Sequence, residues 1–478
     1  MWPVWYQSPR EAECLLKRHD SELQKNDYPM TNIFTLPQTD AINRVIREVF
    51  EIDPVDMVIG TEVLYRSNDP EAYDRIRAEF EASLQGRIDE TTIRKRTFFG
   101  PDFAVFLETA YPRSEVAGLS EHSVFYYPIC TREEIASIER PTSAAHHLLK
   151  IRAEEITESA RLNRVFLLRR EKVGAAWSLT SHFDTHAFEE YLFSLPDALR
   201  AQCERVEAGF AFLLDPNAAC IRSPHGDIIV VSETLGEYLF FMNLFLMTQD
   251  QSIPPEDTAA ALYIAIRTMM STESPDFDLD PRGNPPEPMN SHCRAMVREQ
   301  LQFVIGHEYA HHILGHMGTR QQVTSAHEVF PGKLGSSERV YSRSQQQEFE
   351  ADRAALLDPD LSDGQLSIRL GAVSYFFFGL ELWQTVRDFI APAVRPSTHP
   401  PARDRLVRLR DAVLGARIID PERVGDDEAI RSNFDHLDRI KDSLRNRVLP
   451  LEIEAIERYG STYLPSYRRK VLHDRIDY

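Results

Sequence analysis

Long uninterrupted apolar runs are missing from this sequence. A membrane-spanning helix needs roughly 18 or more consecutive apolar residues, and the two best candidates, Tyr238–Met247 and Ala372–Leu380, are about half that length. We expect both to be buried helices. The N-terminal residues also lack a basic start followed by an apolar run and a small-residue cleavage site. We therefore expect no secretory signal and a cytoplasmic location.

Cysteine is scarce as well. The cysteines are odd in number and show no CxxC spacing: Cys14, Cys130, Cys203, Cys220 and Cys293. This pattern argues against a disulfide framework and against a cysteine-ligated zinc site. We expect ordinary reduced residues of the core.

Positive charge is in deficit, with a formal net charge of -20. Binding to nucleic acid or to an anionic membrane depends largely on neutralising phosphates, so neither is expected as a main partner. No internal repeat occurs at a fixed period. The length and the apolar fraction of 42% suit a globular protein of two or three domains.

The first half of the chain mixes helical and strand-like patterns. In residues 1–150, an N-terminal α/β region of unknown function, helical periodicity alternates with aromatic pieces that resemble strands. The helical pieces are Asp40–Glu51 and Glu71–Gln85, and the strand-like pieces are Thr97–Glu108 and His122–Ile129.

Residues 151–233 predict a small α/β unit. Asn163–Arg170, Gly209–Leu214 and Asp227–Ser232 are interpreted as strands, and Ala187–Ala208 as a helix. The unit is either a separate regulatory or substrate-recognition module, or part of the helical domain that follows, to which its last strand would supply an edge strand.

The second half of the chain is almost wholly helical by pattern. Residues 234–416 contain a Pro/Asp-rich linker, Ser274–Pro288, and then a long helix that we expect to be capped by Ser291. A polar loop follows from Met317 to Ser344. Residues 417–478 are expected to form a charged helical tail, appended to the rest.

The long helix carries the pattern HExxH at His307, Glu308 and His311. Histidines four residues apart on a helix lie on one face, so both imidazoles can reach one zinc ion. Glu308, about 100° round the helix, can act as the base for a water on that ion. An apolar helix with two buried imidazoles and a carboxylate is costly unless something pairs them.

Two further histidines follow the motif. His316 comes five residues after His311, about 140° round an ideal helix, and so is expected to face away from the metal. The extended pattern HExxHxxGxxH fails, because Leu314 and Met317 occupy its last two positions. We expect His312 and His316 to be hydrogen-bonding residues rather than ligands.

A third ligand is expected from the segment "EFEAD". Glu348 and Asp352 are also four residues apart on a helical pattern, so both carboxylates can face the first helix. Glu348 would complete the three protein ligands of a catalytic zinc site. Asp352 would accept the remaining N–H of a ligating histidine and so select its tautomer.

Three separated motifs, "HEYAH", "EFEADRAA" and "STHPPARDRL", resemble in order and detail the HtpX-like and CAAX prenyl protease family of gluzincin metallopeptidases. The similarity spans roughly residues 227–414. It implies one zinc ion bound by His307, His311 and Glu348, with Glu308 as catalytic base and Asp352 in support. It also places His399 and Arg405 near the site. A looser similarity connects the chain to phage-exclusion peptidases of the Lit type.

We therefore expect an α+β fold, in which a mainly helical zincin-like domain with a small sheet follows an α/β N-terminal region. The expected function is that of a soluble zinc metalloendopeptidase acting on a protein or peptide substrate. A regulatory ligand or partner would bind the N-terminal region. His399 is the first candidate for stabilising the oxyanion, with Tyr309, Tyr341 and Arg405 as alternatives. Two other functions stay open, a defence or toxin-type protease activated by a signal, and a non-catalytic zinc-binding sensor.

Overall fold

The computed structural model describes residues 40–67, 70–84, 96–120, 122–213, 217–247, 253–316, 345–390, 400–416, 427–468 and 470–474. These residues divide into two compact units. Unit 1 comprises the described residues up to Glu139 together with Ile156–Leu179. Unit 2 comprises Arg140–Glu155 together with the described residues from Thr180 onward.

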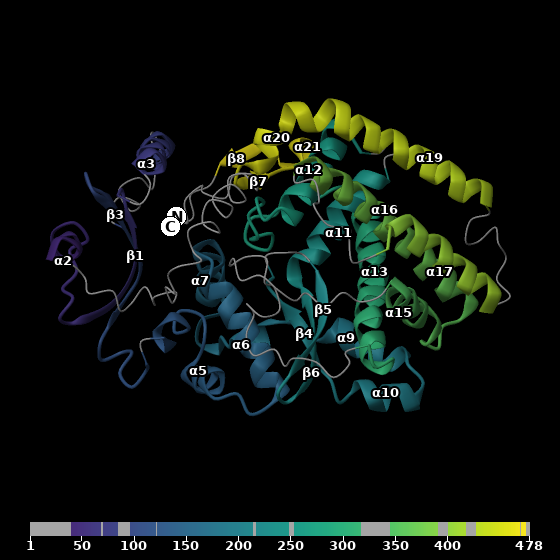
Figure 1. The fold of residues 1–478 in the computed structure, drawn as a ribbon, viewed down its shortest axis with the longest axis horizontal. Helices are drawn as coiled ribbons and strands as arrows, with labels where there is room; N and C mark the ends of the chain where they lie inside the picture. The colour runs from purple at the N-terminus through teal and green to yellow at the C-terminus, as the bar shows by residue number, and fades with distance from the viewer. Residues whose placement is uncertain are drawn as a thin grey trace, which may run out of the picture. The chain divides into compact units, whose positions relative to one another are not determined.

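Unit 1 contains a three-stranded antiparallel sheet with the strand order β1-β3-β2, built from β1 (Met57–Tyr65), β2 (Thr97–Phe99) and β3 (Phe103–Pro112). Alternate residues of β3 enter two different apolar clusters, as the period of a strand requires. Val105 and Leu107 pack with α2 (Asp40–Glu48), whereas Ala104 and Phe106 pack with α3 (Pro70–Leu84). The two helices thus cover opposite faces of the sheet (Figure 1). The predicted helices and the predicted strand piece Thr97–Glu108, which forms β2 and β3, are confirmed, whereas β1 was not predicted.

Two predicted strands are helical instead. His122–Ile129 forms a 3-10 turn, η3 (Ser123–Phe125), with turns around it. Asn163–Arg170 lies within helix α7 (Ala160–Val173), which Ser159 caps by accepting the N–H of Leu162. A short apolar run does not separate strand from helix, and this one has the helical spacing on its buried face: Leu162, Val165, Phe166 and Arg169.

The remaining elements of unit 1 and its borders are short or helical. They are α5 (Arg132–Glu139), α6 (Ala144–Thr157), η4 (Gly174–Ala176) and α8 (Leu179–His182).

Unit 2 contains a second three-stranded sheet, of order β4-β6-β5, in which β4 (Glu207–Ala211) runs parallel to β6 (Gly226–Ser232) and β5 (Ala218–Ser223) runs antiparallel to it. The strands expected around Gly209 and Asp227 are therefore present, while β5 was missed. The expected helix Ala187–Ala208 is split by Pro196 into α9 (His186–Ser194) and α10 (Asp197–Cys203). Ile229 and Val231 face the main core, which includes the motif helix.

The helical body of unit 2 surrounds the 27-residue helix α13 (Glu287–Ile313). Helices α11, α15 and α16 pack around α13, and α17 packs on α15 and α16 (Figure 1). Asn243 of α11 and Gln300 of α13 exchange two hydrogen bonds at 2.9 and 3.0 Å, and Gln300 also donates to the carbonyl of Ala372 in α16. The bounds are α11 (Glu233–Leu246), α12 (Pro255–Met269), α15 (Gln345–Leu357), α16 (Asp363–Ile390) and α17 (Ala402–Ala416).

The C-terminal segment contributes to the same core. Apolar residues of α19 (Asp427–Ser443), α20 (Leu449–Glu457) and the residues after them join the main cluster, among them Leu437, Leu449 and Leu464. The elements between and after these helices are the π-helical turn η6 (Leu444–Val448), β7 (Gly460–Thr462), α21 (Pro465–Arg468) and β8 (Leu472–Asp474).

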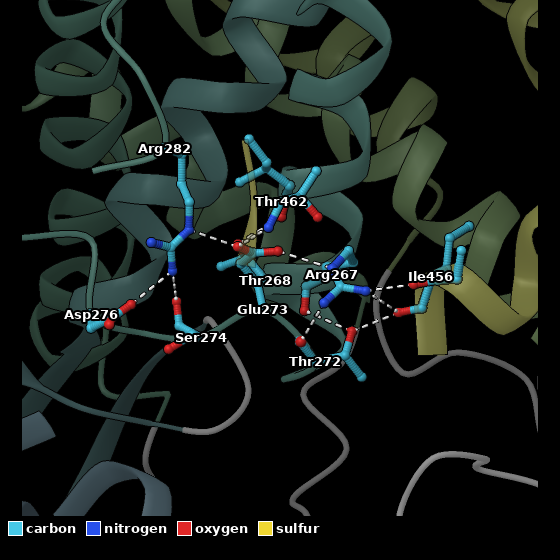
Figure 2. Close-up of polar contacts among 11 residues, drawn as sticks. Arg267, Thr268, Thr272, Glu273, Ser274, Asp276, Arg282, Ile456 and Thr462 are labelled. Carbon is cyan, nitrogen blue, oxygen red and sulfur yellow. Dashed lines mark hydrogen bonds and ion pairs between the residues drawn. The ribbon is translucent and has the colours of Figure 1, made fainter. Parts of the chain in front are cut away.

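A buried ion network joins this C-terminal segment to the chain before α13 (Figure 2). Glu273 accepts from Arg267 at 2.9 Å, from Arg282 at 2.7 Å and from the backbone N–H of Thr462 at 2.8 Å. The three charged side chains are at most 1% exposed. The Pro/Asp-rich stretch expected to be a linker is therefore an ordered part of the core, and α13 begins at Glu287, one turn before the expected cap Ser291.

The structure is thus a mainly helical α+β fold, as predicted. Within the described ranges, no helix combines the length and apolar character that crossing a membrane requires. The described cysteines are buried and free of disulfides: Cys130, Cys203, Cys220 and Cys293. Cys14 lies outside the described residues.

Candidate metal centre

Close packing fixes the end of α13 that carries the motif. Gly306, just before His307, faces the ring of Tyr191 from α9, and a Cβ at this position would lie 2.6 Å from Tyr191 Cε2. Only glycine allows this approach. Tyr309 stacks on the same ring with centroids 5.5 Å apart and is 1% exposed. Tyr309 therefore belongs to the core, about 200° round the helix from His307, and we withdraw it as an oxyanion candidate.

Small residues bring α15 against α13. Ala310 of α13 packs with Ala351 and Ala354 of α15 in a separate buried cluster. Methyl side chains let the two helix backbones approach closely, and the side chains that flank this contact then meet across it. Glu348 thereby reaches His307 and His311.

His307, His311 and Glu348 form a buried group that can hold a metal ion, with one ligand atom of each within 4.8 Å of the others. His307 Nε2 lies 3.0 Å from His311 Nε2 and 3.6 Å from Glu348 Oε2, and His311 Nε2 lies 3.7 Å from Glu348 Oε1. Ligand atoms bound tetrahedrally at about 2.0–2.1 Å are roughly 3.3 Å apart. The three distances bracket that value, so the donor set fits one small cation.

The Nδ1 atom of His307, the ring nitrogen that points away from the other ligands, is hydrogen-bonded to the ion pair of Asp352 and Arg405. His307 Nδ1 lies 2.9 Å from Asp352 Oδ1, and Arg405 donates to Asp352 Oδ2 from Nε at 2.7 Å. Burial raises the pKa of Asp352, but the charge and hydrogen bonds of Arg405 outweigh it and lower that pKa to about 2. The ionised carboxylate can only accept, so His307 carries its proton on Nδ1 and presents the Nε2 lone pair to the group.

Arg405 also balances the other carboxylates of the site. Its Nη1 lies 3.7 Å from Glu348 Oε2. Burial lowers the pKa of Arg405, but the carboxylates of Asp352, Glu348 and Glu308 raise it more strongly, so the net shift is upward. Glu308 is itself 4% exposed. One buried guanidinium thus offsets the charge of neighbouring carboxylates, which would be costly to bury alone.

His316 lies beside the ligands, contrary to the expected angle. Helix α13 ends at Ile313, and Gly315 follows with a φ of 67°. The N–H of Gly315 donates to the carbonyl of His312 and the N–H of His316 to that of His311, both at 3.0 Å. This is a Schellman motif. It turns the chain back, so that His316 Nδ1 lies 2.8 Å from His311 Nδ1. His316 is a hydrogen-bonding residue, as expected, but for a different geometric reason.

His312 belongs to another network. Its Nδ1 lies 2.6 Å from Oδ2 of Asp227, the second residue of β6, which also pairs with Arg222 of β5. Hydrogen bonding was expected of His312, but its partner was not, because nothing local to His312 indicates a residue 85 positions earlier in the chain.

The predicted site residues are thus largely brought together. His307, His311 and Glu348 converge, Glu308 lies on the same helix, and Asp352 and Arg405 support them. His399 and Tyr341 lie outside the described residues, so the proposed oxyanion role of His399 stays a prediction.

Comparison with known proteins adds no assignment: no family model, curated protein or solved structure matches this chain. A functional proposal for this chain therefore rests on the geometry of the site.

Proposed function

We propose that this chain is a zinc-dependent metalloendopeptidase of the gluzincin type. The observation that carries the proposal is the convergence of two HExxH imidazoles and a carboxylate from a second helix at 3.0 to 3.7 Å, with all three residues buried. Two histidines and one carboxylate are a ligand set that catalytic zinc uses, because it leaves a position for water.

The proposed chemistry divides between the metal and this chain's own residues. Bound zinc would lower the pKa of a water molecule and polarise a peptide carbonyl. His307, His311 and Glu348 would hold it. Glu308 would take the proton from the attacking water and return it to the leaving nitrogen. Asp352 and Arg405 would keep His307 in the tautomer that binds the metal.

The burial of Glu308 favours an enzyme over a zinc-binding sensor. A sensor needs the three ligands but has no use for a further carboxylate beside them. Glu308 is 4% exposed, and a carboxylate buried to this extent needs the compensating charge that Arg405 supplies. A carboxylate kept at this position is more easily explained by a role as base. Regulation through the N-terminal region, activation by a signal and the cytoplasmic location stay predictions from the sequence.

The direct test exchanges the base alone. Glu308→Gln should keep the zinc and the fold and lose at least about 100-fold in cleavage of unfolded casein, since general base catalysis contributes that much or more. New peptide termini are counted by mass spectrometry. Glu299→Gln is the matched control on the same helix, where Gln can still accept from Arg369. Equal cleavage by wild type and Glu308→Gln would refute the role of Glu308 as catalytic base and with it the proposed mechanism. Full zinc content with no cleavage by either would favour the sensor.

A further inference from the structure

His316 and Glu350 extend the hydrogen bonding of the proposed metal centre. His316 is 7% exposed, with Nδ1 2.8 Å from His311 Nδ1 and Nε2 3.3 Å from Glu350 Oε2. Glu350 belongs to α15, and Gln346 donates to its other oxygen at 2.9 Å. The hydrogen-bonded series therefore runs from Glu350 through His316 to His311. The other ring nitrogen of His311, Nε2, lies 3.0 Å from His307 Nε2 and 3.7 Å from Glu348 Oε1.

The direction of these hydrogen bonds is set by the acceptor at their outer end. A carboxylate only accepts, so a neutral His316 must carry its proton on Nε2 and present a lone pair at Nδ1. His311 must then donate from Nδ1, which leaves a lone pair on its Nε2. If His316 instead carried its proton on Nδ1, its Nε2 lone pair would face the Glu350 carboxylate. Two hydrogen-bond acceptors would then meet without a proton between them, which is unfavourable.

We propose that His316 and Glu350 are positioning residues that fix the proton of His311 on Nδ1 and so direct its Nε2 to the metal. The inference rests on the proposed metal centre and names which residues orient its second histidine. His307 is held differently, by a carboxylate directly. The two imidazole ligands thus have unequal partners, a carboxylate for His307 and an imidazole for His311.

The pairing predicts a measurable loss on removal. Partners that orient a metal-ligating histidine typically contribute about 10–100-fold to metal affinity. His316→Ala should therefore weaken zinc binding by about 10–100-fold in competition with a chelator. His316→Asn keeps an acceptor near the position of Nδ1 and should restore part of the affinity. His312→Ala is the matched control, because His312 is also a histidine at this helix end but bonds to Asp227 instead of a ligand.

A second readout reports the hydrogen bond itself. In the cobalt-substituted protein, the Nδ1–H protons of ligating histidines give shifted NMR signals that persist in water only when the protons are protected from exchange. Wild type and His312→Ala should show one such signal from His307 and one from His311. His316→Ala should lose the His311 signal by exchange, and His316→Asn should retain it.

The outcomes separate this inference from the proposed function. Wild-type protein that binds neither zinc nor cobalt overturns both. Normal zinc binding, with Glu308→Gln inactive and with His316→Ala equal to wild type in affinity and in both proton signals, overturns the positioning role alone. If His316→Ala is poorly folded by circular dichroism, His316→Asn decides: an affinity below that of wild type with a retained His311 signal supports the role, whereas unchanged affinity despite a lost His311 signal contradicts it.

Discussion

Charged and polar side chains buried in unit 2 are paired with partners that offset the cost of their burial. Asp227 is an example away from the proposed ligands: it is 8% exposed and bonds to His312 and Arg222. Burial raises the pKa of Asp227, but the hydrogen bonds from His312 and Arg222 outweigh it and lower the pKa from 3.8 to about 2. Folding therefore favours the charged form of this carboxyl.

The downward shift of the pKa of Asp227 determines how its contribution to stability changes with pH. A carboxylate whose pKa is lowered by folding stabilises the protein above its unfolded pKa of 3.8, and the stabilisation is lost as the pH falls toward about 2. Asp227→Asn should therefore unfold at a lower urea concentration than wild type at pH 7, with a difference that shrinks below about pH 4. The exposed Asp197→Asn should behave like wild type throughout. A difference for Asp227→Asn that is constant or grows toward acid would contradict the assigned pairing.

At the scale of elements, the metal centre depends on how closely two helices approach. The alanine cluster of Ala310, Ala351 and Ala354 sets the spacing of α13 and α15. The ligands themselves come from both helices, so their separation is controlled by residues that never contact the metal.

Enlarging the alanine contact should therefore weaken the site. Ala351→Leu adds bulk at a fully buried position, which typically costs about 1–3 kcal/mol of stability and here would move Glu348 away from His307 and His311. We expect zinc affinity to fall by more than roughly 10-fold, measured by chelator competition, because one of the three ligands is displaced. Arg353→Leu adds the same side chain on the exposed face of α15 and should bind zinc normally. Equal zinc affinity in both variants would show that the spacing is not set by this contact.

The parts of the site that the sequence predicted are those whose geometry is local. Two residues four positions apart on a helix lie on the same face, independently of the rest of the fold. This rule correctly paired His307 with His311 and Glu348 with Asp352. His316 was misplaced because the helix ends before it. Gly315 has a left-handed backbone conformation, which ends the helix. A glycine near a helix end can indicate this, but the histidine directly after it suggested that the histidine-rich helix continued.

Other elements depend on tertiary context. The partner of His312 is set by the pairing of β5 with β6, and no periodicity near His312 indicates it. Helix α7 was predicted as a strand because a short apolar run is compatible with either a strand or a helix. Arg169 completes the buried face of the helix, but arginine is rarely expected in a core.

For the whole of unit 2, the C-terminal segment is part of the structure that supports α13. Arg267 and Arg282 converge on Glu273, and the same carboxylate accepts from the backbone of β7. Two guanidinium groups that are at most 1% exposed depend on acidic partners here, since isolated buried charges are strongly unfavourable.

Removing that charge should destabilise the unit. Glu273→Gln leaves two buried guanidinium groups undercompensated, and breaking such a pair typically costs about 3–5 kcal/mol. The urea midpoint should fall clearly. Glu190→Gln is the matched control, because its partner Arg298 is 63% exposed and surface pairs contribute only about 0–1 kcal/mol. Equal midpoints for the two variants would refute the structural role of the network.

The central claim is that His307, His311 and Glu348 hold one zinc ion. Diffraction from crystals of the zinc-loaded protein, collected on both sides of the zinc absorption edge, tests it most directly. We predict one strong anomalous peak per chain at about 2.0–2.2 Å from Nε2 of His307, Nε2 of His311 and a carboxylate oxygen of Glu348. No peak among these atoms, or a peak bound by other residues, would contradict the claim.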